Sequence, residues 1–437
     1  MLTPLGGTMQ TTLKPAVKLT ILAALLSSAH AHAQQIQSST STAVSNVYST
    51  YAVGGVGGYQ PPAVNIPQSS GRGVYIDRFL LKFDFGVNIG HDSNVNLTNG
   101  PGKVSSNFVM YTPRATLSRN FGTSRLDAYY TGHYMRYGGA SSFDYNDSDV
   151  GLNAAKEWTS RLKTTLRLDY TLGHDNANAY VLTSQPQVER WKSPLVQAVV
   201  HYGTDGAKGQ VEVEADYRQQ RYTTDQAIMR QYDLNETRLI GRFYYRIRPK
   251  TQMVFALANQ RDVYPTPAAG INSNATQQRA TVGVKWEATA KTTGQVNVGL
   301  MHMKMDAGGS GNTGLAWDAG VRWAPRTYSV FNLDGSRQYN EWSNNTVAYE
   351  VSQGAVLSWD YGWTPRITST ASLLGYDDNF LGSGRRDKRY GAGLKVSYAL
   401  GRRYHIGLED IVQKRTSNSS QWNFNENITM LTLDAAL

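Results

Sequence analysis

The sequence predicts an all-β protein, a transmembrane antiparallel β-barrel of the outer-membrane type with about 18 strands, short periplasmic turns and long extracellular loops. Three observations predict this fold: an N-terminal export signal, a hydrophobic alternation of period two over most of the chain, and connections that alternate between short and long. The chain divides into a signal peptide (1–33), a low-complexity flexible leader (34–74) and the barrel (75–437).

The composition excludes several classes of protein. The 437 residues are 17% charged and 40% hydrophobic, which is too polar for a bundle of membrane helices. The absence of cysteine removes disulfides, thiolate metal sites and cysteine nucleophiles. Glycine (41) and tyrosine (27) are abundant and proline (14) is scarce, as expected of many twisted strands. The net charge of +10 is spread over alternating segments, so we expect no nucleic-acid partner.

The first residues have the anatomy of a secretory signal peptide. Lys14 and Lys18 precede a short apolar core at 19–26, and Ala31-His32-Ala33 forms a cleavage site. No later stretch has the roughly 18 consecutive apolar residues that a helical anchor needs. An exported chain of this kind belongs either in the soluble periplasm or in the outer membrane. The leader is rich in Gln, Ser, Thr, Val and Gly, and we expect it either to hang in the periplasm or to plug the pore.

The alternation begins near residue 74 and favours a membrane barrel over a soluble sandwich. For example, Val211, Val213 and Ala215 alternate with Glu212 and Glu214, so the segment has one apolar and one charged face. A soluble sandwich also alternates, but these segments are roughly 12 to 16 residues long, whereas soluble strands average five or six.

The connections complete the argument for a barrel. Short ones such as 121–124 and 248–250 alternate with long ones such as 92–105, 175–191 and 380–387. An even strand count places both ends of the chain on the periplasmic side. The eighteen expected strands are 78–91, 106–119, 124–137, 144–158, 162–174, 193–203, 209–222, 232–247, 251–263, 275–289, 293–305, 314–324, 327–340, 345–359, 366–378, 388–400, 403–414 and 422–436.

Aromatic residues gather near both kinds of connection, and this predicts one girdle at each membrane–water interface. The alternative is a set of cross-strand aromatic pairs in a soluble sheet. Those near short turns are Trp158, Trp286, Trp323, Tyr328, Trp359, Trp363 and Tyr404. Those near long loops are Tyr137, Tyr222, Tyr264, Tyr339 and Trp422.

A short motif recurs at three places that are expected to be the extracellular ends of strands. Its copies are Gly90-His91-Asp92-Ser93-Asn94, Gly173-His174-Asp175-Asn176 and Gly375-Tyr376-Asp377-Asp378-Asn379. Glycine permits a kink, and Asp and Asn bind neighbouring backbone groups, so the motif is interpreted first as a strand terminator. The alternative is an oxygen-rich rim that binds sugar hydroxyls or Ca²⁺. The three copies lack the ligand spacing of a calcium loop, and we expect neither a metal site nor a cofactor.

With its signal peptide, long alternating barrel and repeated motif, the chain resembles the β-barrel porins found with exopolysaccharide biosynthesis operons, the EpsL-like group. The resemblance implies passage of a polysaccharide across the outer membrane, with periplasmic export or synthase components as partners. Outer-membrane lipid is the partner that the barrel itself implies. No pattern in the sequence indicates an oligomeric state.

The inward faces are expected to carry the chemistry of the pore. Rings of Arg and Lys on a pore wall favour anions, so one hypothesis is a basic track for an acidic polymer. The other is a network of ion pairs that stiffens the wall. The candidate lumen residues are Arg114, Lys163, Arg167, Arg238, Arg242, Tyr244, Arg246, Lys285, Arg322, Arg366, Arg389 and Lys395.

Enzyme motifs are absent. The sequence has no G-x-S-x-G elbow, no H-E-x-x-H, no phosphate loop and no dinucleotide fingerprint. His91–Asp92 and His174–Asp175 could be general-base pairs, but adjacent strand residues point to opposite faces. We therefore expect no enzyme.

The first expectation is export of an acidic exopolysaccharide, with a diffusion porin for small solutes as the alternative and a structural barrel with a closed lumen as the third.

Overall fold

The computed structural model describes residues 73–175, 188–267, 272–289, 291–307, 311–344 and 347–436. The signal peptide predicted at 1–33, the leader from 34 to 72 and Leu437 lie outside these residues. No helix in the described ranges is long and apolar enough to cross a membrane.

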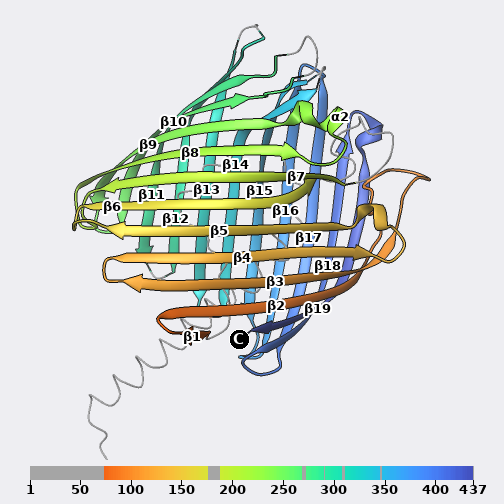
Figure 1. Cartoon of the computed structure of the whole chain (residues 1–437), viewed down its shortest axis with the longest axis horizontal. Helices are drawn as coiled ribbons and strands as arrows, with labels where there is room; N and C mark the ends of the chain where they lie inside the picture. The colour runs from red at the N-terminus through yellow and green to blue at the C-terminus, as the bar shows by residue number, and fades with distance from the viewer. Residues whose placement is uncertain are drawn as a thin grey trace, which may run out of the picture.

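Strands make up nearly all of the described chain (Figure 1). The strands are β1 Val74–Ile76, β2 Phe79–Asp92, β3 Ser106–Phe121, β4 Ser124–Tyr137, β5 Tyr145–Glu157, β6 Leu162–Asp175, β7 Glu189–Tyr202, β8 Gly209–Tyr222, β9 Leu234–Arg248, β10 Thr251–Val263, β11 Ala275–Thr289, β12 Thr292–Met305, β13 Asn312–Arg326, β14 Ser329–Asn344, β15 Val347–Gly362, β16 Ile367–Leu381, β17 Arg385–Ala399, β18 Tyr404–Ser417 and β19 Phe424–Ala436. The short helices are η1 Ser141–Phe143, α2 Gln226–Met229, η2 Arg230–Tyr232 and η3 Ser420–Trp422.

Strands β2 to β19 close into one barrel of eighteen antiparallel strands, which confirms the predicted fold and strand count. Each strand pairs with its sequence neighbours, and β19 returns to β2 with Met430 opposite Gly90. In Figure 1 the near wall, β2 to β10, crosses the far wall, as expected of a barrel with strongly tilted strands. Short turns form one rim, at the lower left, and long loops form the other. The strand β1 pairs only over three residues with β2 at the short-turn rim, and the sequence did not predict it.

The two faces of the wall differ as the alternation predicted. Large apolar side chains on the outer face are exposed, including Ile89, Leu257 and Leu408. Polar and charged side chains on the same strands, such as Asn88 and Glu409, face inward and are buried. A surface of exposed apolar side chains around a charged interior is stable in lipid and unstable in water.

The aromatic girdle predicted at the short turns is confirmed. Trp158, Trp363 and Tyr404 are 62%, 62% and 57% exposed on the outer face. The girdle predicted at the long loops from Tyr137, Tyr222, Tyr264, Tyr339 and Trp422 is wrong, because the last four are buried and Tyr137 packs into an inner cluster. The lipid-facing aromatics of that half are instead Tyr111, Tyr170, Tyr217 and Tyr390, each a few residues below the long-loop end of its strand.

Four loops at the long-loop rim end in the same way. The Asp or Asn directly before the returning strand accepts one backbone N–H. That N–H belongs to a residue at, or next to, the end of the outgoing strand. The bonds are Tyr137 N to Asp144 Oδ1 (2.8 Å), Tyr222 N to Asp233 Oδ1 (2.8 Å), Tyr264 N to Asn274 Oδ1 (2.8 Å) and Ser417 N to Asn423 Oδ1 (2.6 Å). In three of the loops a buried aromatic residue precedes the acceptor: Phe143, Tyr232 and Trp422. Burial raises the pKa of Tyr232 to about 12.

Several boundaries differ from the predicted ones. The long loop expected at 380–387 shrinks to 382–384, because β16 continues to Leu381 and β17 begins at Arg385. The strand expected from 193 begins at Glu189, and the rest of its preceding loop, 176–187, lies outside the described residues. Polar and charged residues fill these strand ends, so their hydropathy resembles that of a loop although their backbone still pairs.

The loop-closing bonds predict a specific loss of stability. Replacing Asp144→Ala or Asp233→Ala leaves one backbone N–H without its partner, and we expect the free energy of unfolding to fall by about 1 kcal/mol for each change. Urea titration of the barrel in lipid vesicles, followed by tryptophan fluorescence, measures this. Ser142→Ala, an exposed residue in the same turn, is the matched control. Equal unfolding curves for Asp144→Ala and Ser142→Ala would contradict the stated role of the bond.

Candidate functional site: the charged lumen

The predicted lumen residues lie on the inner face of the wall with one exception. Registers place Arg242 opposite Glu212 and Lys395 opposite Glu409, both of which face inward. Arg366 is the exception, because it lies in the exposed turn between β15 and β16 and not on a strand. The inward candidates are Arg114, Lys163, Arg167, Arg238, Arg242, Tyr244, Arg246, Lys285, Arg322, Arg389 and Lys395.

Arg238 and Arg242 on the inner face of β9 are neutralised by acids of the neighbouring strand β8. The Arg242 side chain is fully buried and binds Glu212 at 2.8 Å and Glu214 at 2.7 Å through Nη1. Arg238 binds Asp216 at 2.6 Å and also reaches Glu214 at 3.5 Å. The acids of β8 alternate just as the bases of β9 do, so the two inner faces form a ladder of opposite charges.

Four further candidate cations are also paired with acids. Arg389 binds Asp378 at 2.5 Å and lies 4.9 Å from the centre of the Tyr376 ring. Lys395 lies 3.8 Å from Glu409, and both are buried. Arg167 binds Asp169, which also accepts the hydroxyl of Tyr129. Lys163 binds Glu157 and Asp205 at the short-turn rim. These contacts favour the hypothesis of a stiffened wall for this group.

A smaller group of lumen cations has no acidic partner at bonding distance among the residues that the structure describes. Arg246 donates to backbone carbonyls, including that of Pro249 at 2.6 Å. Lys285 lies 5.8 Å from the centre of the Tyr244 ring. Lys285 and Arg322 form no ion pair within the described part of the chain, and both are half-buried on the inner face. Arg114 lies opposite Asp84 in the register of β2 and β3.

Two copies of the strand-end motif build the same structure. Asp92 ends β2 and accepts the Asn94 N–H (2.8 Å) and the Tyr137 hydroxyl (3.3 Å). Asp175 ends β6 and accepts the Tyr222 hydroxyl (2.6 Å) and the Trp191 indole N–H (3.0 Å). In both copies the tyrosine comes from the strand two positions further around the barrel. Asp175 therefore fastens β6 to both β7 and β8, whereas Asp92 fastens β2 to β4.

The motif glycines make room for aromatic rings. A Cβ on Gly90 would lie 2.7 Å from the Phe108 ring, and one on Gly173 would lie 2.5 Å from the Trp191 ring. The histidines have different partners: His91 faces outward and binds Asn107 (2.8 Å), whereas His174 binds Asp147 (2.9 Å). His91 is therefore separated from Asp92 by the wall itself.

The third copy is not at a strand end, which corrects the prediction for Gly375, Tyr376, Asp377, Asp378 and Asn379. These residues lie within β16, two residues before its end at Leu381. Asp378 faces inward and accepts the Ser352 hydroxyl at 2.7 Å. No atom lies within 4 Å of a Cβ built on Gly375, so no ring covers this copy. Within the described residues no group of three or more His, Asp or Glu is arranged to hold a metal ion.

Sequence reasoning missed a set of acids and loop contacts at the long-loop rim. The inward acids there include Asp147, Glu189, Glu236, Asp262 and Glu426, four of them buried, and the same alternation could have located them. The loops also pack together: Ala140, Phe143 and Val188 form a buried cluster with Val95 and Val104 from the loop after β2. This contact joins segments that no pattern in the sequence relates.

A second cluster narrows the opposite side of the rim. The pairing of β13 with β14 ends at Trp317 and Arg337, although both strands continue. Beyond that point Tyr339, Tyr349 and Val351 are buried against Met301 and Met303, which face the lumen. The top of the β14–β15 hairpin therefore leans inward over the inner face of β12.

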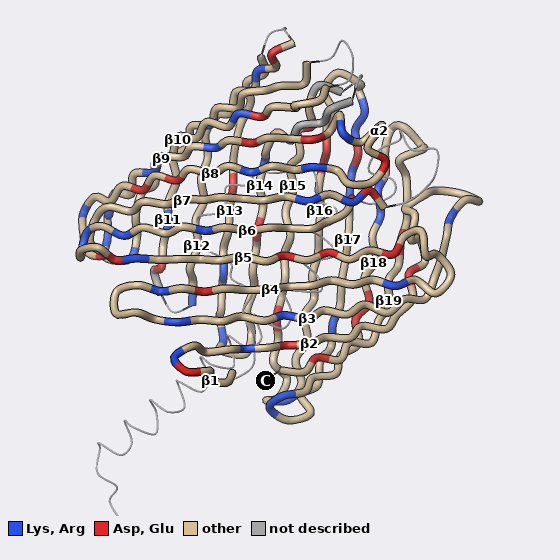
Figure 2. The backbone as a smooth tube through the Cα atoms, viewed as in Figure 1, with Lys and Arg blue, Asp and Glu red and all other residues tan. Residues whose placement is uncertain are grey.

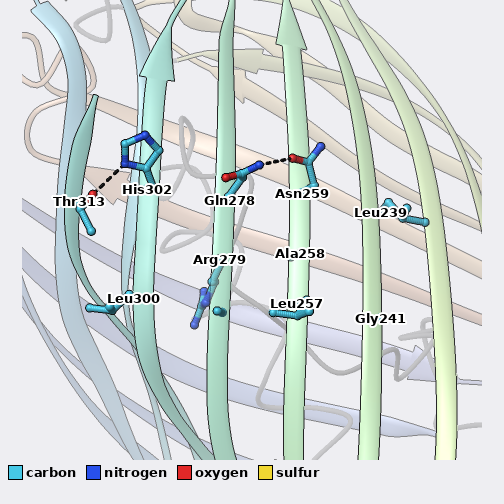
Figure 3. A pocket seen from close by; sticks show the side chains of 11 residues that line it. Leu239, Gly241, Leu257, Ala258, Asn259, Gln278, Arg279, Leu300, His302 and Thr313 are labelled. Atoms are coloured by element: carbon cyan, nitrogen blue, oxygen red, sulfur yellow. Dashed lines mark hydrogen bonds between the residues drawn. The ribbon is translucent and has the colours of Figure 1, made fainter. Parts of the chain in front are cut away.

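The hollow shown in Figure 3 lies on the outer face and is not part of the lumen. It has a volume of about 520 Å³ and crosses β9 to β13. Its leucines are exposed to lipid, and the polar residues drawn above them are joined in two hydrogen bonds, Gln278 to Asn259 (3.5 Å) and His302 to Thr313 (2.8 Å). This change from leucine to polar residues marks the level at which the lipid-facing band ends on these strands.

A family profile described as "Putative beta-barrel porin 2" matches residues 67–437. The chain belongs to this family, and it is a porin-like channel protein of the outer membrane. A search of curated protein sequences found no match.

Solved structures with a similar fold are distant in sequence. The FrpB iron transporter from Neisseria meningitidis (F3-3 variant) is 12% identical with a TM-score of 0.42, over 77% of this chain and 62% of FrpB. A BenF-like porin from Pseudomonas fluorescens Pf-5 is 11% identical with a TM-score of 0.48, over 83% and 100%. OccK2 from Pseudomonas aeruginosa, in complex with glucuronate, is 12% identical with a TM-score of 0.46, over 82% and 98%.

The buried ion pairs predict a large effect at one arginine. Arg242→Gln removes the cation that Glu212 and Glu214 share and leaves Glu214 only its longer contact with Arg238, so we expect the free energy of unfolding to fall by about 3 kcal/mol. Arg246→Gln, which removes an arginine bound to backbone at the short-turn rim, is the control and should cost much less. Denaturant unfolding in vesicles measures both. If Arg242→Gln and Arg246→Gln unfold at the same urea concentration, the ladder does not stabilise the wall.

The motif glycines predict opposite results for one substitution. Gly173→Ala pushes the Trp191 ring off its bond to Asp175, and we expect destabilisation of about 1 to 3 kcal/mol from overpacking. Gly375→Ala meets open space and should be neutral or mildly stabilising. The same unfolding assay compares them. Equal destabilisation by both changes would show that the ring contact has no special role.

Proposed function

We propose that the protein is a diffusion channel for small polar solutes or ions, with selectivity set by the inner face of the barrel. The observation that carries this proposal is the packing at the long-loop rim. Loops lean together on one side and the β14–β15 hairpin leans inward on the other, so the mouth is narrower than the ring of strands. A narrowed, charged passage suits small polar solutes, because they fit its diameter and its polar lining replaces part of their hydration.

Export of an acidic exopolysaccharide, the first expectation from the sequence, ranks second. A polymer track needs a row of available cations along the pore. Arg238, Arg242 and Arg389 are instead held by carboxylates, and the rim adds further acids such as Asp92 and Asp175. A family resemblance is the only support for a polysaccharide substrate and for periplasmic export or synthase partners.

The test combines swelling of vesicles with secretion by cells. Vesicles containing the purified barrel should swell in monosaccharides and fail to swell in long oligosaccharides. A strain that lacks the protein should still secrete its usual extracellular polymer. Loss of the polymer would favour export, whereas a barrel with neither swelling nor ion conductance would favour the third expectation, a structural barrel with a closed lumen.

The cations without acidic partners predict the ion selectivity. Lys285→Glu combined with Arg322→Glu reverses two lumen charges without breaking an ion pair, and we expect the reversal potential in planar bilayers to shift toward cations. Arg366→Glu, in the exposed turn, is the control and should shift it little. An unchanged reversal potential in the double variant would show that these residues do not border the ion path.

A further inference from the structure

Four outward-facing cations at the long-loop rim have no acidic partner among the described residues. We call these four the outer basic patch: Arg136 on β4, Arg190 and Lys192 on β7, and Arg221 on β8. The register places Lys192 opposite Leu172, a lipid-facing residue that is 40% exposed. In Figure 2 blue segments mark Lys and Arg near the loop ends of the near-wall strands.

The groups that the patch binds within the protein are neutral. Arg221 donates to the carbonyl of Leu234 at 2.7 Å, and Arg136 donates to the Asn146 side chain at 2.6 Å. Arg190 donates to the carbonyl of Asp144 at 3.0 Å. Across the described ranges no ion pair joins any of the four to a carboxylate. Within those ranges, no carboxylate neutralises their positive charge.

Another outward arginine shows the contrast. Arg261 faces outward at the same rim and binds Asp306 at 2.5 Å. The hydrogen bond from Arg261 holds the pKa of the Asp306 carboxyl below its usual range. This part of the rim supplies its own counter-charge, whereas the described residues around the outer basic patch supply none.

Two cations of the patch also repel each other. Lys192 and Arg221 are opposite each other in the register of β7 and β8, and like charges in that position destabilise a strand pair. An anion bound between the two cations would remove the repulsion. Below them Tyr170 and Tyr217, 44% and 42% exposed, face the lipid. The site thus combines cations for a charged headgroup with aromatic and apolar surface for acyl chains.

We propose that the outer basic patch binds the phosphate groups of a phosphorylated glycolipid, the lipid A of the outer leaflet. The patch is on the outer face, so the proposal is independent of what passes through the lumen. It makes the leaflet lipid a specific ligand of the barrel wall. The phosphates supply the counter-charge that Lys192, Arg221 and Arg190 do not receive from the described residues.

Binding of diphosphoryl lipid A to the full barrel in nonionic detergent tests the proposal, with native mass spectrometry as the readout. We expect Lys192→Gln with Arg221→Gln to weaken binding by about tenfold or more, because each charge-assisted contact is worth more than a neutral one. Lys192→Arg with Arg221→Lys keeps both charges and should bind like the wild type. Arg248→Gln with Lys250→Gln removes two exposed charges at the short-turn rim and should also bind like the wild type.

Several outcomes would overturn the proposal. These are unchanged binding in the Lys192→Gln/Arg221→Gln variant, an equal loss in the Arg248→Gln/Lys250→Gln control, and equal competition by phosphatidylglycerol or inorganic phosphate. Migration of unheated protein on a denaturing gel checks that each variant is folded. If the double variant does not fold, Lys192→Gln alone decides, because no hydrogen bond of its side chain to the described residues is at stake, and unchanged affinity in it would equally overturn the proposal.

Discussion

The structure depends on one constraint: a backbone that crosses lipid must satisfy every N–H and C=O within the protein. Closure of β19 onto β2 meets that constraint, because neither of these two strands is left as a free edge of the sheet. Closure in turn defines an inner and an outer face. Because side chains along a strand alternate with a period of two residues, successive side chains point to opposite faces. The exposed leucines and the buried Arg242 are two results of the same hydrogen-bonded ring.

The partners of the charged side chains differ between the two faces of the wall. On the inner face, arginines and carboxylates of adjacent strands meet, as Arg242 meets Glu212 and Glu214. On the outer face near the long loops, Arg136 donates to the neutral Asn146 side chain, and Lys192 lies opposite another cation, Arg221. The difference follows from what each face meets. Charges on the confined inner face must be neutralised by neighbouring side chains, whereas the outer rim faces a leaflet that carries its own anions.

The sequence was a good guide wherever one local rule controls the result. Alternation located the strands, their count and the inward face of residues such as Arg389, because the period of two is a property of the backbone itself. It could not show that Asp378 would hold Arg389, since partners on neighbouring strands depend on register. It also misjudged Tyr222 and Trp422, because proximity to a loop says nothing about which face a ring occupies. The inward lean of Tyr339 depends on where the β13–β14 pairing stops, which no hydropathy pattern reveals.

The seam between β19 and β2 has a consequence for biogenesis. There the hydroxyl of Ser93 accepts the backbone N–H of Asn427, across 334 positions of chain. A ribosome finishes β19 last, so β2 must wait as an unsatisfied edge while all the intervening hairpins form. Such long-range contacts make spontaneous folding slow, and the partly folded intermediates are prone to aggregate. A folding factor that covers the unpaired edge of β2 until β19 has formed would therefore determine the rate at which this protein folds.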